Sequence, residues 1–314
     1  MSINKQIVDI ANSSLSEIGK VEHLRDLINE ENYKEVPFDT SDEIHIVATL
    51  FKLELLLSSN EIIPDSIDDV FSSVVAAVPF VKNKGINSEE YLKAFIKVKY
   101  HDIYGDYQLI TGLYYDSIID CVNKKVLLAN SIQSNFDQLL NQINLKSLEL
   151  LIISGYDFRK DIVLDFLDKS VDWNGVNDVT KRIYELITNK RLVSIELFDS
   201  FLKNIQFAVF IRRLNYDDLV KNVLENNIFN LSKYYKAINI SKVSFLLNAD
   251  RKIEDLIIEM IISNKLPPNS KIDQAQNLLL FGDTRINNDL NSLNNHVKEV
   301  GEIIDQVLQL VSDA

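Results

Sequence analysis

Four histidines and a single cysteine are the side chains of this chain that could bind a metal ion or act as a nucleophile. The histidines lie far apart, and none belongs to a His-x-His or His-Glu-x-x-His group, the spacings with which helices bind zinc: His23, His45, His101 and His296. Cys121 has no histidine near it in the sequence that could activate its thiol, so we interpret it as a small buried hydrophobic residue. These patterns predict no catalytic residue, no metal site and no cofactor.

Paired carboxylates and glycines give no stronger signal for catalysis. The acidic pairs Asp68-Asp69 and Glu89-Glu90 stand where we expect helices to begin, and negative charge there stabilises the positive end of the helix dipole. The eight glycines are scattered, so the sequence has no glycine-rich phosphate loop. A hydrolase is therefore the function class that the sequence supports least.

The charge and composition restrict the partners and the compartment. A net charge of -13 disfavours general binding to nucleic acid or to anionic membrane, because both require a basic surface. One cysteine cannot form an internal disulfide, which fits a reducing compartment. The first residues lack the apolar core of a signal peptide, and no run approaches the roughly 20 apolar residues that span a bilayer. We expect a soluble protein of the cytoplasm and nucleus, with no nucleic-acid or membrane partner.

The distribution of prolines predicts that the chain is mainly α. No proline occurs between Pro79 and Pro267, and proline inside a helix costs about 3 kcal/mol. Helical periodicity recurs in segments of about 10 to 18 residues joined by short polar connections, which is what stacked helix pairs require. We predict an irregular helical-repeat array, similar to TPR arrays, over residues 1–214, although no strict sequence repeat is present.

The pattern changes after Asn215 and predicts a winged-helix module over residues 215–285. Two helices are expected at 217–226 and 229–236. Two more should follow, at 242–247 with Ser241 as its N-cap and at 251–264 with Asp250 as its N-cap. Pro267 and Pro268 end the last helix. Two strand-like runs, 271–273 and 278–281, flank a polar turn and complete the module as a small hairpin.

The last segment, residues 286–314, carries a heptad pattern of apolar residues. The positions between them are mostly polar, and apolar residues every 3.5 positions form helices that pack against other helices. The seam consists of Leu290, Leu293, Val297, Val300, Ile304, Val307 and Val311. We expect this helix to join a bundle formed with other protein chains.

The stretch from Leu219 to Arg285 resembles the end of a PCI domain, the module shared by the COP9 signalosome, the proteasome lid and translation initiation factor 3. Within that family it is most similar to subunit 4 of the COP9 signalosome. The resemblance depends on apolar spacings and a few polar groups: Asn226 to Leu231, Ser232-Lys233-Tyr234-Tyr235, Ile238, Ile240, Leu247, Met260, Ile272-Asp273-Gln274, Phe281 and Thr284-Arg285.

This resemblance implies a non-catalytic scaffold in a complex that removes the ubiquitin-like modifier from cullins. The implied partners are other PCI-domain subunits, a metalloprotease subunit and cullin-RING ligases. In such complexes the winged helices join edge to edge through their short strands, which assigns the strand residues to an interface: Lys271, Ile272, Asp273, Leu278, Leu279, Leu280 and Phe281. Four aromatic residues are further interface candidates, with core packing as the default interpretation: Tyr234, Tyr235, Phe245 and Phe281.

Two other interpretations stay open. A subunit of the proteasome lid or of translation initiation factor 3 would differ in its partners only. A winged-helix regulator of nucleic acid would need a basic reading helix, yet the residues from Asn239 to Leu266 are balanced in charge. Four basic residues face four acidic ones there: Lys242, Arg251, Lys252 and Lys265 against Asp250, Glu254, Asp255 and Glu259.

Overall fold

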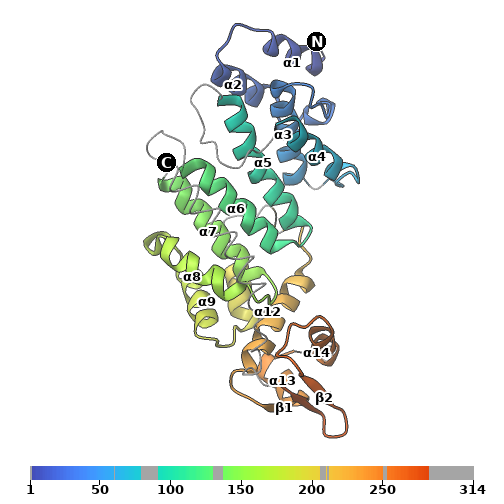
Figure 1. Ribbon diagram of the computed structural model, residues 1–314, viewed down its shortest axis with the longest axis vertical. Helices are drawn as coiled ribbons and strands as arrows, with labels where there is room; N and C mark the ends of the chain where they lie inside the picture. Colours follow the sequence, from blue (N-terminus) through green and yellow to red (C-terminus); the bar gives the residue numbers. More distant parts are fainter. Residues whose placement is uncertain are drawn as a thin grey trace. The chain divides into compact units, whose positions relative to one another are not determined.

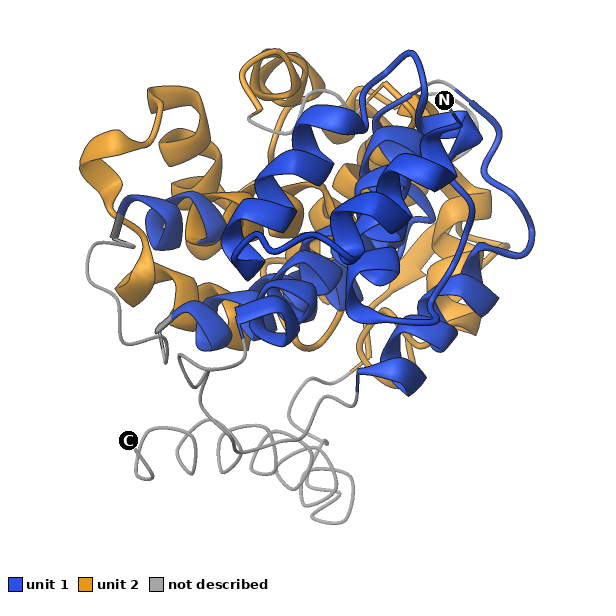
Figure 2. Cartoon of the chain, turned by 90° about the horizontal axis from the view of Figure 1, so that it is seen from above, with its two compact units in different colours: residues 1–143, 309–314 blue, residues 144–308 orange. Residues whose placement is uncertain are grey.

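The computed structural model describes residues 2–59, 61–78, 91–129, 137–205, 210, 212–249 and 253–282. Within these residues the chain forms thirteen α-helices and three short β-strands (Figure 1), which confirms the prediction of a mainly α protein. The chain divides into two compact units (Figure 2). The described residues up to Ile143 form the first unit, and those from Asn144 onward form the second.

The first unit consists of helices packed around α3. Its elements are α1 (Ile3–Ala11), α2 (Glu17–Leu27), the 3-10 helix η1 (Tyr33–Glu35), α3 (Glu43–Ser58), α4 (Ile67–Ala77), α5 (Tyr91–Ile110) and α6 (Tyr114–Ala129). The carboxylate of Asp42 starts α3 by accepting hydrogen bonds from the amides of Ile44 and His45. Ten of the sixteen residues of α3 are buried, so this helix is the centre of the unit.

A tight turn joins α5 to α6 as a helical hairpin. Gly112, two residues after the end of α5, has φ +83°, a left-handed conformation that favours glycine. The amide of Leu113 then donates to the carbonyl of Gln108 at 2.8 Å, which closes the last turn of the helix. The hairpin fixes α6 against α5.

The second unit continues with helices and ends in a small sheet. Its elements are α7 (Asp137–Ile153), which contains the boundary between the units, α8 (Lys160–Ser170), the 3-10 helix η2 (Trp173–Gly175), α9 (Asp178–Thr188), α10 (Ile195–Leu202), α12 (Tyr216–Leu231), β1 (Ala237–Asn239), α13 (Ile240–Leu247), α14 (Ile253–Ile262), β2 (Lys271–Asp273) and β3 (Leu278–Leu280). Trp173 packs its ring 4.5 Å from that of Tyr184 and donates its indole N–H to the carbonyl of Asp168.

Helices α12, α13 and α14 share one apolar core with the sheet. The buried cluster consists of Ile228, Leu231, Ile238, Ile240, Val243, Leu247, Ile253, Leu256, Ile257, Met260, Leu266, Leu279 and Phe281. The sheet is antiparallel, with strand order β1-β3-β2. Three helices and a three-stranded sheet around a common core agree with the predicted winged helix, and both predicted strands are confirmed.

Three details of this module differ from the sequence-based expectation. The segments 217–226 and 229–236 were expected to be separate helices, but α12 runs unbroken through Leu231 because partners outside the helix bind its asparagines. No strand was expected at β1, Ala237–Asn239. The side chain that caps α13 belongs to Asn239, which accepts from the amide of Ser241, so Ser241 is not the cap. The predicted cap Asp250 lies outside the described residues.

Candidate protein-interaction site on the winged helix

The two predicted interface strands occupy different places in the sheet. In β3, Leu279 pairs with Ile238 of β1 on one side and with Ile272 of β2 on the other. The backbone of β3 is therefore already hydrogen-bonded along both edges, and the expectation that residues 278–281 form an edge is wrong. Within the described residues, the sheet ends at β1 and at β2. Of the predicted interface set, only Lys271, Ile272 and Asp273 belong to an edge strand.

The run 278–281 contributes to the core through Leu279 of β3 and through Phe281, the residue after the strand. Leu279 is fully buried and Phe281 is nearly so, and both side chains pack in the apolar core of the winged helix. Leu280 differs from them, because it contributes to the wall of a surface groove. The interface role predicted for β3 can thus extend to the Leu280 side chain, but its backbone has no free edge for a partner.

The groove lies between α14 and the β2 edge. Its volume is about 560 Å³, and it is lined by Ile258, Ile261, Ile262, Ser270, Lys271, Ile272, Asp273, Gln274 and Leu280. Two isoleucines of α14 leave large parts of their side chains in water, 75% of Ile262 and 38% of Ile258. Isoleucine residues gain about 1.5–3 kcal/mol when they are fully buried, so this surface favours an apolar partner.

The edge strand and the groove can act together. An edge strand offers unpaired N–H and C=O groups to a strand of another chain, and the neighbouring groove can hold an apolar side chain of that strand. Lys271 and Asp273 supply one positive and one negative charge beside the apolar wall. These features fit protein recognition by strand addition.

The aromatic interface candidates divide into exposed and buried residues. Phe245 on α13 is 84% exposed and Tyr234 is 60% exposed, whereas Phe281 belongs to the core. Tyr235 is partly buried and packs against the winged-helix core. The default expectation of core packing is thus wrong for Phe245 and Tyr234. The heptad residues from Leu290 to Val311 lie outside the described residues.

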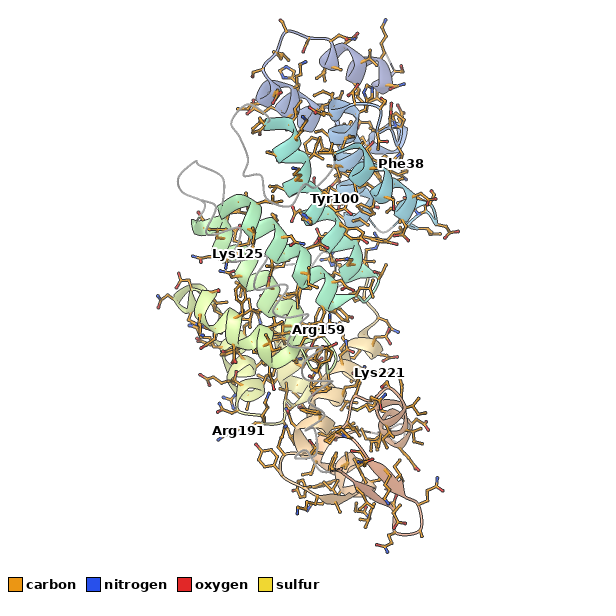
Figure 3. The ribbon with its side chains drawn as sticks, viewed as in Figure 1. Phe38, Tyr100, Lys125, Arg159, Arg191 and Lys221 are labelled. Carbon is orange, nitrogen blue, oxygen red and sulfur yellow. The ribbon has the colours of Figure 1, made fainter. Side chains whose placement is uncertain are left out.

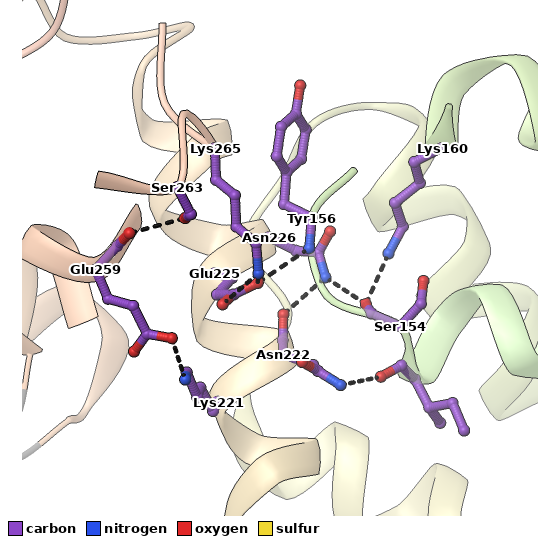
Figure 4. A network of polar contacts seen from close by, with 11 residues as sticks. Ser154, Tyr156, Lys160, Lys221, Asn222, Glu225, Asn226, Glu259, Ser263 and Lys265 are labelled. Atoms are coloured by element: carbon purple, nitrogen blue, oxygen red, sulfur yellow. Dashed lines mark hydrogen bonds and ion pairs between the residues drawn. The ribbon is translucent and has the colours of Figure 1, made fainter. Parts of the chain in front are cut away.

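One side of α12 carries a row of polar residues that bind backbone atoms of the preceding helical region. Figure 3 labels Lys221 near this row, where its ammonium pairs with Glu259 of α14 at 2.6 Å. Asn222 donates to the carbonyl of Ile153 at 2.9 Å, and Asn226 donates to that of Ser154 at 2.8 Å (Figure 4). Both asparagines thereby satisfy carbonyl groups at the end of α7 that the helix leaves unpaired.

Glu225 is the most buried charged group of this row. Its carboxylate forms an ion pair with Lys265, at 2.8 and 2.7 Å from the two oxygens, and accepts from the amide of Tyr156 at 3.3 Å (Figure 4). A Cβ atom on Gly155 would lie 2.6 Å from the Glu225 carboxylate, so only glycine allows the loop to approach this closely. Because Lys265 follows α14, the pair connects the winged helix to the loop after α7.

A second loop binds farther along the same helix. Asn227 accepts from the amide of Val193 at 2.9 Å and donates to its carbonyl at 2.8 Å, while Asn230 donates to the carbonyl of Arg191. This polar face of α12, which we define as Asn222, Glu225, Asn226, Asn227 and Asn230, was not predicted from the sequence. Asparagine is a poor residue for a helix interior, so several asparagines one turn apart were the available signal.

A buried lysine lies beside the polar face. The side chain of Lys160 donates to the carbonyl of Ser154 at 3.2 Å (Figure 4), and the residue is only 3% exposed. Burial, together with the positive charge of Lys190, lowers the pKa of Lys160 to about 7. This amine therefore changes its charge near neutral pH.

The residues that could support catalysis or metal binding remain dispersed. In unit 1, His101 bonds to the carboxylate of Asp120 at 2.5 Å, and Cys121 is buried. Over the described ranges, no three His, Cys, Asp or Glu side chains come together in a way that could hold a metal ion. None of the helices described here is both long enough and apolar enough to cross a membrane.

Comparison with known proteins identifies the C-terminal module. Residues 199–283 match the family model of the PCI domain. No curated protein matches the chain. The matched range contains α12, the three strands and both further helices of the winged helix. The resemblance to a PCI domain is thereby confirmed, and the chain is a protein with a PCI domain at residues 199–283.

Proposed function

We propose that this chain is a non-catalytic scaffold subunit of a COP9 signalosome-like complex that removes the ubiquitin-like modifier from cullin-RING ligases. The PCI domain is typical of scaffold subunits in the COP9 signalosome, the proteasome lid and translation initiation factor 3. The observation that carries the proposal is the combination of this domain with a β2 edge beside an exposed apolar groove.

Assembly through this surface follows from its chemistry. The winged helix of another PCI subunit would add a strand to β2 and place an apolar side chain against Ile258 and Ile262. The polar face of α12 supports such a role, because it fixes the winged helix to the loops after α7 and α9. A partner held at β2 is then held in a defined direction relative to those helices.

The heptad segment supplies a second attachment in this proposal. Its seven seam residues would enter a helical bundle with the corresponding segments of other subunits. Two linked attachments raise the overall affinity above that of either one alone. The chemical step would belong to a separate metalloprotease subunit, and we expect the complex in the cytoplasm and nucleus.

The identity of the complex is tested by purifying the tagged chain from its own cells and identifying its partners by mass spectrometry. The proposal predicts other PCI subunits, a metalloprotease subunit and an activity that removes the ubiquitin-like modifier from cullins in the purified material. Proteasome or ribosome-associated partners would assign the chain to the lid or to translation initiation factor 3 instead.

The two attachments can be tested separately in the same purification. Replacing Val297, Val300 and Ile304 with Asp should remove the partners by introducing charge into the bundle. Ile258→Asp together with Ile262→Asp should weaken the edge contact. The matched control is Ile62→Asp, since Ile62 is 91% exposed and lies in the other unit. Undiminished assembly of both sets of variants would refute the proposed mode of assembly.

A further inference from the structure

The winged helix carries a basic surface, although the chain as a whole is acidic. The segment 232–249 contains three lysines and no acidic residue, although the whole chain has a net charge of -13. The three lysines, Lys233, Lys236 and Lys242, are all exposed. A local excess of positive charge on an acidic protein marks a surface that attracts anionic groups.

Contacts within this segment bring the charges together with aromatic rings. The ammonium of Lys242 lies 5.3 Å from the ring centre of Tyr235, and that of Lys233 lies 4.9 Å from the ring of Phe229. Phe245 is three residues after Lys242 on α13, so both side chains occupy the same face of the helix. Phe245 is 84% exposed, an unusual position for a large apolar ring.

The loop after α9 extends the surface by one more cation. The hydroxyl of Tyr234 donates to the carbonyl of Asn189 at 3.4 Å, and Asn230 binds the carbonyl of Arg191. Arg191 is exposed, and Figure 3 labels it at the end of the α9 region. The acidic residues that flank this loop, Glu185 and Glu196, belong to the helices on either side of it. We define the basic surface as Arg191, Lys233, Tyr234, Lys236, Lys242 and Phe245.

We propose that the basic surface binds an acidic peptide segment of a partner protein that carries an aromatic or large aliphatic residue among its carboxylates. Each of the four cations can donate hydrogen bonds to a carboxylate, and the partner's apolar residue would cover the Phe245 ring. This site goes beyond the assembly contacts at β2, because it uses α13 and the segment before β1 instead of the β2 edge.

The dimensions of the surface favour a peptide over nucleic acid. A nucleic-acid strand carries a phosphate charge about every 3.4 Å and would continue past four cations onto an acidic protein. A short peptide can bind its few carboxylates to the lysines without extending onto the acidic part of the protein. The acidic residues of α14, Glu254, Asp255 and Glu259, add to the repulsion of a long polyanion.

The test uses a fluorescein-labelled 16-residue peptide with a central Phe flanked by Glu and Asp, titrated with the full chain. Fluorescence anisotropy should show binding that weakens when salt is raised, because the contacts are ionic. A peptide with Gln and Asn in place of the acids, one with Ala in place of Phe, and a single-stranded oligothymidine are the matched probes. All three should bind at least about tenfold more weakly.

Variants locate the site. The triple variant Lys233→Ser, Lys236→Ser and Lys242→Ser should weaken binding at least about tenfold, and Phe245→Ala should weaken it several-fold. The control triple variant, Lys5→Ser, Lys169→Ser and Lys203→Ser, removes the same charge from other exposed lysines and should bind as the unaltered chain does. Circular dichroism verifies that each variant is folded.

Four outcomes would overturn the proposal. They are binding weaker than about 1 mM, equal loss in the two triple variants, oligothymidine binding as tight as that of the acidic peptide, and self-association of the chain that the basic-surface variant abolishes. The first two outcomes would show that the basic surface is not a peptide-binding site. The third would show that it binds nucleic acid, and the last that it binds a second copy of the chain. None of them bears on the β2 edge, which is tested by its own variants.

Discussion

The two sides of α12 perform different tasks with neighbouring residues. Ile228 and Leu231 enter the apolar core of the winged helix, where both are buried among side chains of α13, α14 and the sheet. Asn227 and Asn230 point to the loop after α9 and bind its backbone. Apolar burial supplies most of the folding free energy but is not directional, whereas hydrogen bonds add less energy and define geometry.

The comparison shows how a scaffold can hold an interaction surface in a fixed direction. An apolar contact alone would let the winged helix shift against the helices before it. The polar face of α12 prevents this, because each asparagine must meet a particular carbonyl or amide. We therefore expect variants of the apolar side to affect mainly stability, and variants of the polar side to affect both stability and orientation.

The largest effect is expected for Ile228→Ala. The Ile228 side chain is fully buried, with 0% of it exposed to solvent. Its truncation leaves a cavity and should lower the free energy of unfolding by about 2–5 kcal/mol. Denaturant unfolding followed by the fluorescence of Trp173, the single tryptophan, reports on this unit. Ile262→Ala is the control, because that side chain is 75% exposed. Equal losses in the two variants would contradict the assigned core.

Glu225→Ala should be the most damaging change on the polar side. It leaves the Lys265 ammonium and the Tyr156 amide without their acceptor, at a cost of about 2–3 kcal/mol. Glu259→Ala breaks the pair with Lys221, in which both side chains are exposed, and should cost less than about 1 kcal/mol. The assignment of Glu225 as a structural anchor fails if the two substitutions cost the same.

Asn227→Ala gives the direct counterpart of Ile228→Ala, one residue away. The loss of two hydrogen bonds to Val193 should cost about 1–2 kcal/mol and expose the Val193 amide to faster hydrogen exchange. Asn204→Ala removes only a bond within an exposed helix end and should leave that amide unchanged. Unaltered exchange at Val193 in the Asn227 variant would show that the loop is held by other contacts.

Lys160→Met is expected to act with the opposite sign, stabilising the chain at and below neutral pH. The pKa of Lys160 is about 7 in the folded chain, against an ordinary value of 10.5, so between these values the unfolded chain binds the extra proton. The contribution of this group to stability therefore rises with pH from about 7 to about 10.

The methionine variant removes this dependence. It should be more stable than the unaltered chain at pH 6.5, and the advantage should decrease steadily toward pH 10. Thermal unfolding of both proteins across that range measures the difference. An advantage that stays constant with pH would mean that Lys160 remains charged in the folded chain.

The sequence was sufficient where local patterns determine the structure. The run at 271–273, the polar turn after it and the run at 278–280 predicted the hairpin, because two strand-like segments around a turn pair locally. The PCI resemblance came from apolar spacings in the same region. The end of the last helix was predicted less well: α14 ends at Ile262, five residues before Pro267, and Asn264 with φ +56° turns the chain there.

Pairing between segments far apart in the sequence could not be predicted from local patterns. Ala237–Asn239 becomes a strand only because β3, about 40 residues later, pairs with it, and that pairing puts β3 in the centre of the sheet. The polar face of α12 depends on loops that lie 34 to 72 residues earlier in the sequence. Neither partner can be identified from the helix itself.

We propose that the β2 edge and its groove hold a neighbouring PCI subunit. The most direct test places a photo-crosslinking amino acid at Lys271 and, as a control, at Ile62, in the complex assembled in cells. Position 271 should crosslink to the winged helix of another PCI subunit, and position 62 should not. An intact complex in which position 271 reaches no PCI subunit would contradict the claim.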